Sequence, residues 1–210
     1  MNKLIIVGAG GFGRDLLSWV QAIPTQERDW ELAGFLDDNP EALKGYSCNL
    51  PIMGNIKDYR PRKDDRLVMG VASPTSLKLE IAQQMLNKGA NFISIIHPTV
   101  VKGINIKIGQ GCVICPYALI GNNNKIGDFV TINVFTSIGH DVIVGDGCTF
   151  HTHISISGFV KLGRGVEVGS HGCIIPHIKV GEFAKVSAGS AVFANVKPGI
   201  TVIGVPAKKL

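Results

Sequence analysis

The clearest candidates for acid–base chemistry are one histidine and the aspartate that follows it. Of the six histidines, all but His97 follow residue 139, and only His140 is followed directly by a carboxylate, Asp141. A carboxylate beside an imidazole fixes the tautomer of the ring and supports it as a general base. Gly158 lies eighteen residues beyond His140, where its N–H could stabilise an oxyanion if the chain repeats with that period. These residues indicate a base, its supporting acid and an oxyanion donor; the alternative is an ordinary polar turn.

A second pair of histidines could bind a metal. His153 and His171 are also eighteen residues apart, and imidazole nitrogen is a common ligand of zinc. A zinc enzyme would need a third histidine, and no other histidine has a spacing that adds it to this pair. We therefore expect solvated turn residues here and no metal.

A glycine-rich segment near the start is the candidate phosphate-binding loop. Residues 8–13 read GAGGFG, follow an apolar run at 4–7 and precede a helical pattern at 12–20. Backbone N–H groups at such a helix start, together with the helix dipole, can hold a diphosphate. Asp37 and Asp38 end the next apolar run and could accept hydrogen bonds from ribose or sugar hydroxyls. The segment is consistent with bound NAD, with a nucleotide-linked sugar, or with a tight turn that binds nothing.

Strand and helix patterns alternate in the first half of the chain. We predict strands at 4–7, 32–36 and 67–71, and helices at 12–20 and 74–88. This order is typical of a Rossmann-like α/β domain with a parallel sheet, here residues 1–97. Three strands are too few for a full dinucleotide-binding fold. We therefore favour a nucleotide-linked sugar as the ligand and expect no binding of NAD(P)H.

The second half of the chain, residues 98–210, has a period of six. Such a period fits neither a helix nor a plain strand, but it fits a short strand plus a corner, three of which make a coil of eighteen residues. The residue after the apolar one is mostly Gly, and the second corner position accepts Gly and Asn, which tolerate left-handed backbone angles. The sequence predicts a parallel β-helix of five coils from fifteen apolar positions: Ile108, Ile114, Ile120, Ile126, Ile132, Ile138, Val144, Phe150, Ile156, Leu162, Val168, Ile174, Val180, Val186 and Val192.

Composition narrows the class of protein and ligand. The chain has 210 residues and a net charge of +5, with no run of Lys or Arg, so a phosphate-rich small ligand is a better expectation than nucleic acid. No apolar run reaches eighteen residues, so we expect no membrane span. The five cysteines are an odd number, which favours reduced thiols in a cytoplasmic protein.

Five segments together resemble a known family, the bacterial sugar O- and N-acetyltransferases with hexapeptide repeats. This family includes the sialic acid O-acetyltransferases and the N-acetyltransferases of the bacillosamine and perosamine pathways. The resemblance covers nearly the whole chain and rests on VGAGGFGRD, FLDDNP, IHPTVV, SIGHDVIVGDG and VIGVPAKKL. It implies a left-handed β-helix, a homotrimer and acetyl-CoA as co-substrate.

The resemblance also implies roles for individual residues. His140 is expected to be the general base and Asp141, where relatives often have Glu, its support. Phe12 stands where many relatives have a histidine in the glycine-rich loop, which puts the identity of the acceptor in question. The positions that match acetyl-CoA contacts are Thr149, Gly158, Ser170 and Ala188. Those that match sugar-nucleotide contacts are Gly10, Gly11, Phe12, Asp37, Asp38 and Gly70.

The expected function is therefore acetyl transfer from acetyl-CoA to an amino or hydroxyl group of a sugar. The sugar is expected to be nucleotide-linked and to serve surface polysaccharide or glycan biosynthesis. Two other classes remain open. One is a metalloenzyme of the γ-carbonic-anhydrase kind on the same β-helix, and the other is a non-catalytic trimer that binds a nucleotide-sugar.

Overall fold

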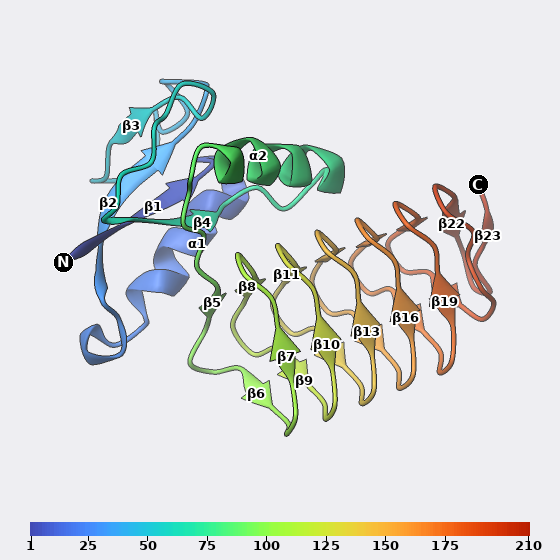
Figure 1. Ribbon diagram of the computed structural model, residues 1–210. Helices are drawn as coiled ribbons and strands as arrows, with labels where there is room; N and C mark the ends of the chain where they lie inside the picture. The colour runs from blue at the N-terminus through green and yellow to red at the C-terminus, as the bar shows by residue number, and fades with distance from the viewer.

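The computed structural model describes residues 1–210 as an α/β domain followed by a β-helix (Figure 1). The α/β domain has a four-stranded parallel sheet in the order β3-β2-β1-β4. The three predicted strands are confirmed, and the short β3 was not predicted. The elements are β1 (Asn2–Val7), α1 (Gly11–Gln21), a 3-10 turn (Thr25–Glu27), β2 (Trp30–Leu36), β3 (Ile52–Gly54), β4 (Asp65–Met69) and α2 (Thr75–Asn87).

The two helices cover opposite faces of this sheet. Leu4 and Ile6 of β1 pack in one apolar cluster with α1, and Ile5 and Val7 pack in another with α2. A strand buried on both faces needs an unbroken apolar run, which is what residues 4–7 supply. No helix in the chain is both long enough and apolar enough to cross a bilayer.

The β-helix has three faces, each a sheet of very short strands. The first sheet contains β5 (Ile95–Ile96), β8 (Val113–Ile114), β11 (Thr131–Ile132), β14 (Thr149–Phe150), β17 (Glu167–Val168), β20 (Lys185–Val186), β22 (Thr201–Ile203) and β23 (Lys208–Lys209). The second contains β6 (Val101–Lys102), β9 (Leu119–Ile120), β12 (Ser137–Ile138), β15 (Ser155–Ile156), β18 (Cys173–Ile174) and β21 (Ala191–Val192). The third contains β7 (Lys107–Ile108), β10 (Lys125–Ile126), β13 (Ile143–Val144), β16 (Lys161–Leu162) and β19 (Lys179–Val180).

Strands eighteen residues apart are hydrogen-bonded neighbours in each face. Thr131 pairs with Thr149 in the first sheet, and Ile138 pairs with Ile156 in the second. Fourteen of the fifteen predicted apolar positions belong to a core of 26 buried residues, and Ile108 packs against this core while partly buried. The prediction of a β-helix with a six-residue period is confirmed.

The corners carry more varied residues than the sequence pattern suggests. The second residue of each corner, one in every six along the chain, has a positive φ. The sequence pattern predicts Gly or Asn at this position. Bulky side chains also occupy it, as at Phe135 (57°) and His153 (58°). Their rings stack on the next coil: the centroids of Phe135 and His153 are 4.9 Å apart, and those of His153 and His171 are 5.0 Å apart with planes only 2° from parallel. Ring nitrogens of stacked, parallel imidazoles point sideways and do not converge on one metal ion.

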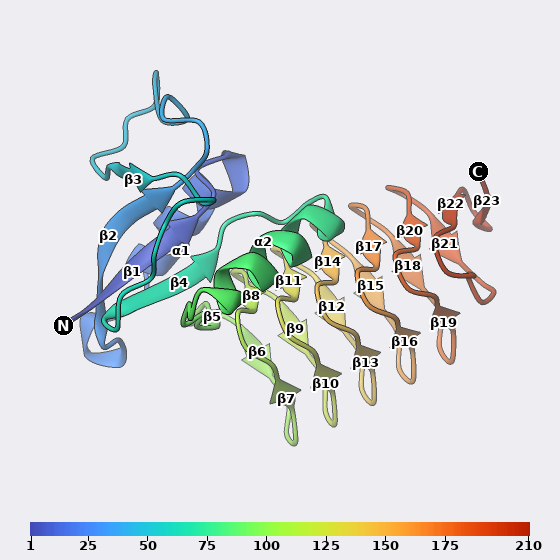
Figure 2. The same ribbon diagram turned by 45° about the horizontal axis from the view of Figure 1, so that its top comes forward.

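α2 packs against the first sheet of the β-helix and connects the α/β domain to it (Figure 2). Lys78 is fully buried, and its Nζ donates hydrogen bonds to Thr131 Oγ1 at 3.2 Å, Cys148 O at 3.1 Å and Thr149 Oγ1 at 2.7 Å. Thr75, at the start of the helix, donates to Gly165 O at 2.8 Å. Burial lowers the pKa of Lys78 to about 7.

Because the Lys78 amine is buried, the free energy of unfolding should increase as the pH rises above about 7. Because the folded pKa lies below the ordinary value of 10.5, the unfolded chain binds more protons between these two values, and the free energy of unfolding rises with pH from about 7. Between pH 7 and 9 we expect a gain of roughly 1–3 kcal/mol in denaturant titrations of the wild type. Above pH 9 the buried thiols Cys112 and Cys148, whose pKa values burial raises to about 11 and about 12, act in the opposite direction.

The matched variants for this experiment are Lys78→Met and, as a control, Lys161→Met on the exposed third sheet. The gain should disappear in Lys78→Met and persist in Lys161→Met. An equal gain in all three proteins would assign it to other groups.

Candidate functional site

An open cleft of about 550 Å³ lies where the α/β domain meets the β-helix, and we name it the domain cleft. Its walls come from the loops after β1, β2 and β4 and from two residues of the β-helix. The lining residues are Gly8, Gly10, Gly11, Phe12, Asp15, Asp37, Gly70, Val71, Ala72, Ser73, Asn133 and His151. The structure thus brings together five of the six residues predicted to bind a sugar nucleotide.

The glycine-rich loop is shaped by close backbone contacts. A Cβ at Gly13 would lie 2.0 Å from the Gly8 carbonyl oxygen, so α1 can start this close to β1 only with glycine there. Gly10 is the N-cap of α1, and no side chain caps the helix. A Cβ at Gly10 or Gly11 would meet no atom within 4 Å, so these residues face open space in the cleft. The first-turn N–H groups of α1 are therefore available to an anion.

The two aspartates after β2 have different environments. Asp37 lines the domain cleft, and its two carboxylate oxygens accept from the N–H groups of Ala9 at 2.8 Å and Asn39 at 2.9 Å. Asp38 does not line the cleft, because its Oδ1 accepts from the Ile56 N–H at 2.8 Å. Asp37 thus holds the glycine-rich loop in place, whereas Asp38 supports the segment after β3.

Phe12 lies in the cleft wall with its ring edge-to-face against Trp19, 5.8 Å between centroids.

The candidate general base lies at the corner between the second and third sheets, which we name the His140 corner. This corner is the column of Asn122, His140, Gly158 and Pro176. His140 Nδ1 lies 2.8 Å from Asp141 Oδ2, and the histidine side chain is 58% exposed. Because a carboxylate only accepts, Nδ1 carries the hydrogen, and Nε2 of the neutral ring is left as the base.

Gly158 lies directly beneath this imidazole, as the register predicts. A Cβ at Gly158 would come within 2.7 Å of His140 Cε1 and 2.8 Å of Nε2, so a larger residue would displace the ring. The Gly158 N–H donates to no acceptor in the chain. The structure therefore brings together the predicted base, its predicted acid and an unpaired N–H donor.

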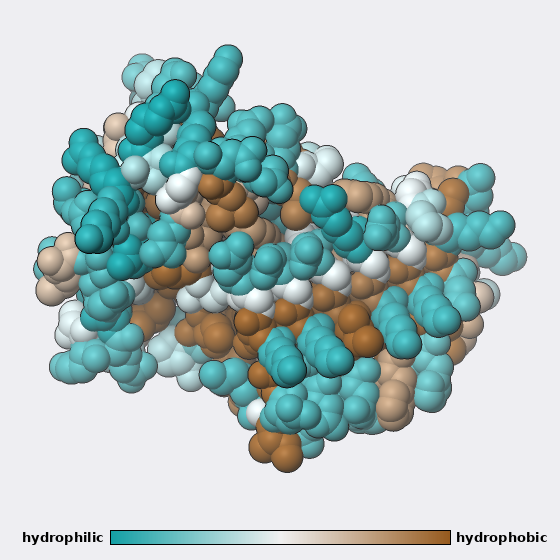
Figure 3. Space-filling model, in the orientation of Figure 1, coloured by the Kyte–Doolittle hydropathy of each residue, from teal (hydrophilic) through white to brown (hydrophobic).

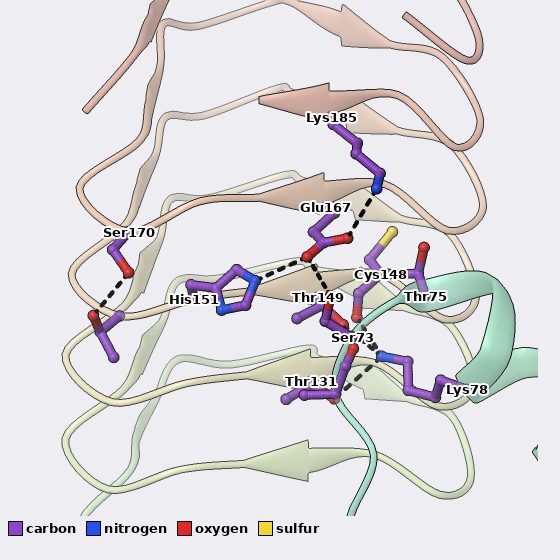
Figure 4. Close-up of polar contacts among 12 residues, drawn as sticks. Ser73, Thr75, Lys78, Thr131, Cys148, Thr149, His151, Glu167, Ser170 and Lys185 are labelled. Atoms are coloured by element: carbon purple, nitrogen blue, oxygen red, sulfur yellow. Dashed lines mark hydrogen bonds and ion pairs between the residues drawn. The ribbon is translucent and has the colours of Figure 1, made fainter. Parts of the chain in front are cut away.

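The positions that match acetyl-CoA contacts do not all lie together. Ser170 and Ala188 lie at the corner between the first and second sheets, the Ser170 corner, which is the column of Pro116, Val134, Thr152, Ser170 and Ala188. Thr152 Oγ1 donates to Ser170 Oγ at 3.2 Å. Thr149 is fully buried: its hydroxyl donates to Ala72 O at 2.6 Å and accepts from Lys78 Nζ (Figure 4). Its side chain is thus committed to the contact between the domains.

A polar network beside the domain cleft was not predicted. Glu167 Oε1 accepts from Ser73 Oγ at 2.6 Å and from His151 Nε2 at 3.0 Å (Figure 4). These hydrogen bonds, first that from His151, lower the pKa of Glu167. Asn133 and His151 are eighteen residues apart, so register counting alone could have placed them side by side. Their position in the cleft depends on where the α/β domain docks, which the period does not encode.

The candidate base and the domain cleft lie at different edges of the second sheet. The cleft borders the end of the first sheet, close to the Ser170 corner, and its lining does not include His140. His140 follows β12, on the opposite edge of the second sheet. A single chain therefore does not bring its own base to its own cleft.

Similarity to known proteins covers both domains. Residues 3–84 match the family described as the PglD N-terminal domain. No curated protein sequence shows significant similarity to the chain.

Three solved structures share the whole fold. WeeI from Acinetobacter baumannii AYE is 25% identical, with a TM-score of 0.87 over all of both chains. PerB from Caulobacter crescentus, in complex with CoA and GDP-perosamine, is 23% identical, with a TM-score of 0.80 over 100% of this chain and 98% of that one. The acetyltransferase domain of PglB from Neisseria gonorrhoeae FA1090, in complex with acetyl coenzyme A, is 22% identical, with a TM-score of 0.68 over all of both chains.

These similarities show that the chain has the two-domain fold of WeeI, PerB and the PglB acetyltransferase domain. The chain joins a PglD-type N-terminal domain to a left-handed hexapeptide-repeat β-helix, which confirms its resemblance to the sugar acetyltransferases of the hexapeptide-repeat family.

Proposed function

We propose that the protein transfers an acetyl group from acetyl-CoA to an amino or hydroxyl group of a nucleotide-linked sugar. The observation that carries the proposal is the His140–Asp141 pair lying over the unpaired N–H of Gly158. Transfer would be a step in the synthesis of a surface polysaccharide or glycan. The five free cysteines are consistent with a reducing cytoplasm.

The geometry of the pair suits direct transfer without a covalent enzyme intermediate. The acceptor nitrogen or oxygen attacks the thioester carbonyl carbon while His140 Nε2 removes its proton. The Gly158 N–H stabilises the tetrahedral oxyanion. The C–S bond then breaks, and the proton held by His140 passes to the sulfur, so that CoA leaves as a thiol.

The domain cleft provides a place for the acceptor. The diphosphate would lie against the first turn of α1, where Gly10 and Gly11 leave N–H groups open. PerB was crystallised with a nucleotide-linked amino sugar and CoA, and this chain has the same two-domain fold. By that analogy the sugar would extend from the glycine-rich loop toward the β-helix.

The active site would be completed by a second subunit in a homotrimer. The outward residues of the second sheet are uncharged, from Val101 and Leu119 to Ser155 and Ala191. The third sheet exposes four lysines, Lys107, Lys125, Lys161 and Lys179, with Ile143 between the second and the third of them. Figure 3 shows this face as a line of hydrophilic patches interrupted by a hydrophobic one. The second sheet is therefore the face suited to the threefold axis. Packing three prisms through it would bring the His140 corner of one subunit next to the Ser170 corner of its neighbour.

The proposed reaction can be tested with a panel of UDP-, dTDP- and GDP-linked amino and neutral sugars. Each sugar is mixed with acetyl-CoA, and release of free thiol is followed together with the mass of the product. At least one sugar should gain an acetyl group at the rate of thiol release. Failure of every sugar to stimulate thiol release would contradict the proposal.

Replacing the candidate base separates catalysis from a purely binding role. His140→Ala should lower kcat by about 10²–10⁴-fold, because no base would then remove the proton from the attacking amino or hydroxyl group of the sugar. Folding and oligomeric state should be unchanged, since the side chain is exposed and its partner Asp141 is its neighbour in the chain. Circular dichroism and gel filtration check this. Activity within threefold of the wild type would remove His140 from the mechanism.

Replacing the supporting acid should have a smaller effect. Asp141→Asn keeps a hydrogen-bond partner for the ring but removes the charge that supports its protonated form. We expect kcat to fall roughly ten- to hundredfold. The control is Asp64→Asn, the same change at an exposed carboxylate of the α/β domain that lies near Lys3 and leaves the pair intact. An Asp141→Asn enzyme with wild-type kcat would show that the carboxylate does not support the base.

A further inference from the structure

His151 is the only titratable side chain that the β-helix contributes to the domain cleft. The other ionisable residues in the lining, Asp15 and Asp37, belong to the α/β domain. His151 follows β14, and its side chain is 33% exposed. It forms no part of the His140 corner, so the mechanism above leaves it without a role.

A buried carboxylate fixes the orientation of the His151 ring. Nε2 lies 3.0 Å from Glu167 Oε1, and the same oxygen accepts from Ser73 Oγ at 2.6 Å. The side chain of Glu167 is only 14% exposed, and Lys185 Nζ lies 3.9 Å from its other oxygen. These neighbours favour the ionised carboxylate, and the pKa of Glu167 is lowered accordingly.

The ionised carboxylate also determines the tautomer of the ring. It can only accept hydrogen bonds, so Nε2 must carry the hydrogen. In the neutral ring Nδ1 is then a hydrogen-bond acceptor. Nδ1 has no partner in the chain, and it lies on the side of the ring away from Glu167 (Figure 4). The domain cleft is therefore lined by an imidazole that presents a fixed acceptor.

The imidazole is not needed to hold the two domains together. Ser73 already bonds to Glu167 across the contact between them, and Thr75 and Lys78 add further hydrogen bonds. A role toward a ligand explains the ring better than a structural role does.

We propose that His151 recognises the acceptor, with Nδ1 accepting a hydrogen bond from an amino or hydroxyl group of the bound sugar. The inference rests on the proposed function and adds a specificity residue to it. His151 positions the acceptor, while His140 of the neighbouring subunit is the base. A site that accepts a hydrogen from the substrate discriminates against analogues that lack this donor, because its own polar group is then left unpaired.

Two isosteric substitutions distinguish recognition from a structural role. His151→Asn keeps a polar atom near the position of Nδ1 but does not reach Glu167. His151→Gln keeps a polar atom near the position of Nε2 and loses the one that faces the cleft. His151→Ala removes both, and His97→Ala is the matched control, because His97 is hydrogen-bonded to Thr99 at the start of the β-helix and does not line the cleft.

The readouts are the acceptor KM, the acetyl-CoA KM and kcat, measured with the best sugar from the panel. We expect His151→Ala and His151→Gln to raise the acceptor KM about tenfold, with the acetyl-CoA KM unchanged. His151→Asn should stay within about threefold of the wild type. The reverse order, with Gln near wild type and Asn as weak as Ala, would make His151 a structural link to Glu167. An unchanged acceptor KM in all three variants would show that His151 does not contact the sugar.

Calorimetric binding of the same nucleotide-sugars without acetyl-CoA separates this inference from the proposed reaction. Binding that depends on His151 in a protein without transferase activity would overturn the reaction and retain the recognition site. Binding and activity that are both insensitive to His151 would overturn the recognition site and retain the reaction. Absence of binding for every sugar would overturn both.

Discussion

The hydrogen-bonded register of eighteen residues per coil is the constraint on which the rest of the structure depends. Backbone N–H groups at the corners donate to the carbonyl one coil earlier, as from Asp141 to Asn122 and from Phe159 to His140. Because the pairing repeats without a slip from β5 to β21, residues eighteen apart lie one above the other. His140 can therefore rest on Gly158, and the same ladder positions the candidate oxyanion donor and the candidate base. An insertion of one residue between positions 140 and 158 would separate them.

The same register keeps the functional residues apart within one chain. The His140 corner and the Ser170 corner lie at opposite edges of the second sheet, and the domain cleft borders the Ser170 corner. In a prism with rigid faces no small movement closes that distance. The fold thus builds half of a site at each edge, and three copies around an axis would join the halves.

The sequence was sufficient to predict what depends on periodicity. The apolar sixth residues specified the β-helix, and spacing placed Gly158 under His140. Periodicity says little about docking of the α/β domain, which depends on side chains from distant segments. Lys78 of α2 is buried against Thr131 and Thr149. The helix therefore covers Thr149, a position that the family resemblance assigns to acetyl-CoA. Asp37 and Asp38 are adjacent in sequence, yet only the first lines the cleft. Likewise, aromatic rings in left-handed corner positions are tolerated because they stack on the next coil.

The central claim of this account is that His140 of one subunit acts on an acceptor held in the cleft of its neighbour. It is tested most directly by mixing two inactive variants, His140→Ala and Gly11→Trp, whose new side chain would start in open space at the cleft, since a Cβ there meets no atom within 4 Å. Random trimers from equal amounts should recover about a quarter of wild-type activity, because a site is intact when its His140 comes from one variant (one half) and its cleft from the other (one half). If the mixture stays inactive although native mass spectrometry shows mixed trimers, each site lies within a single chain and the account is contradicted.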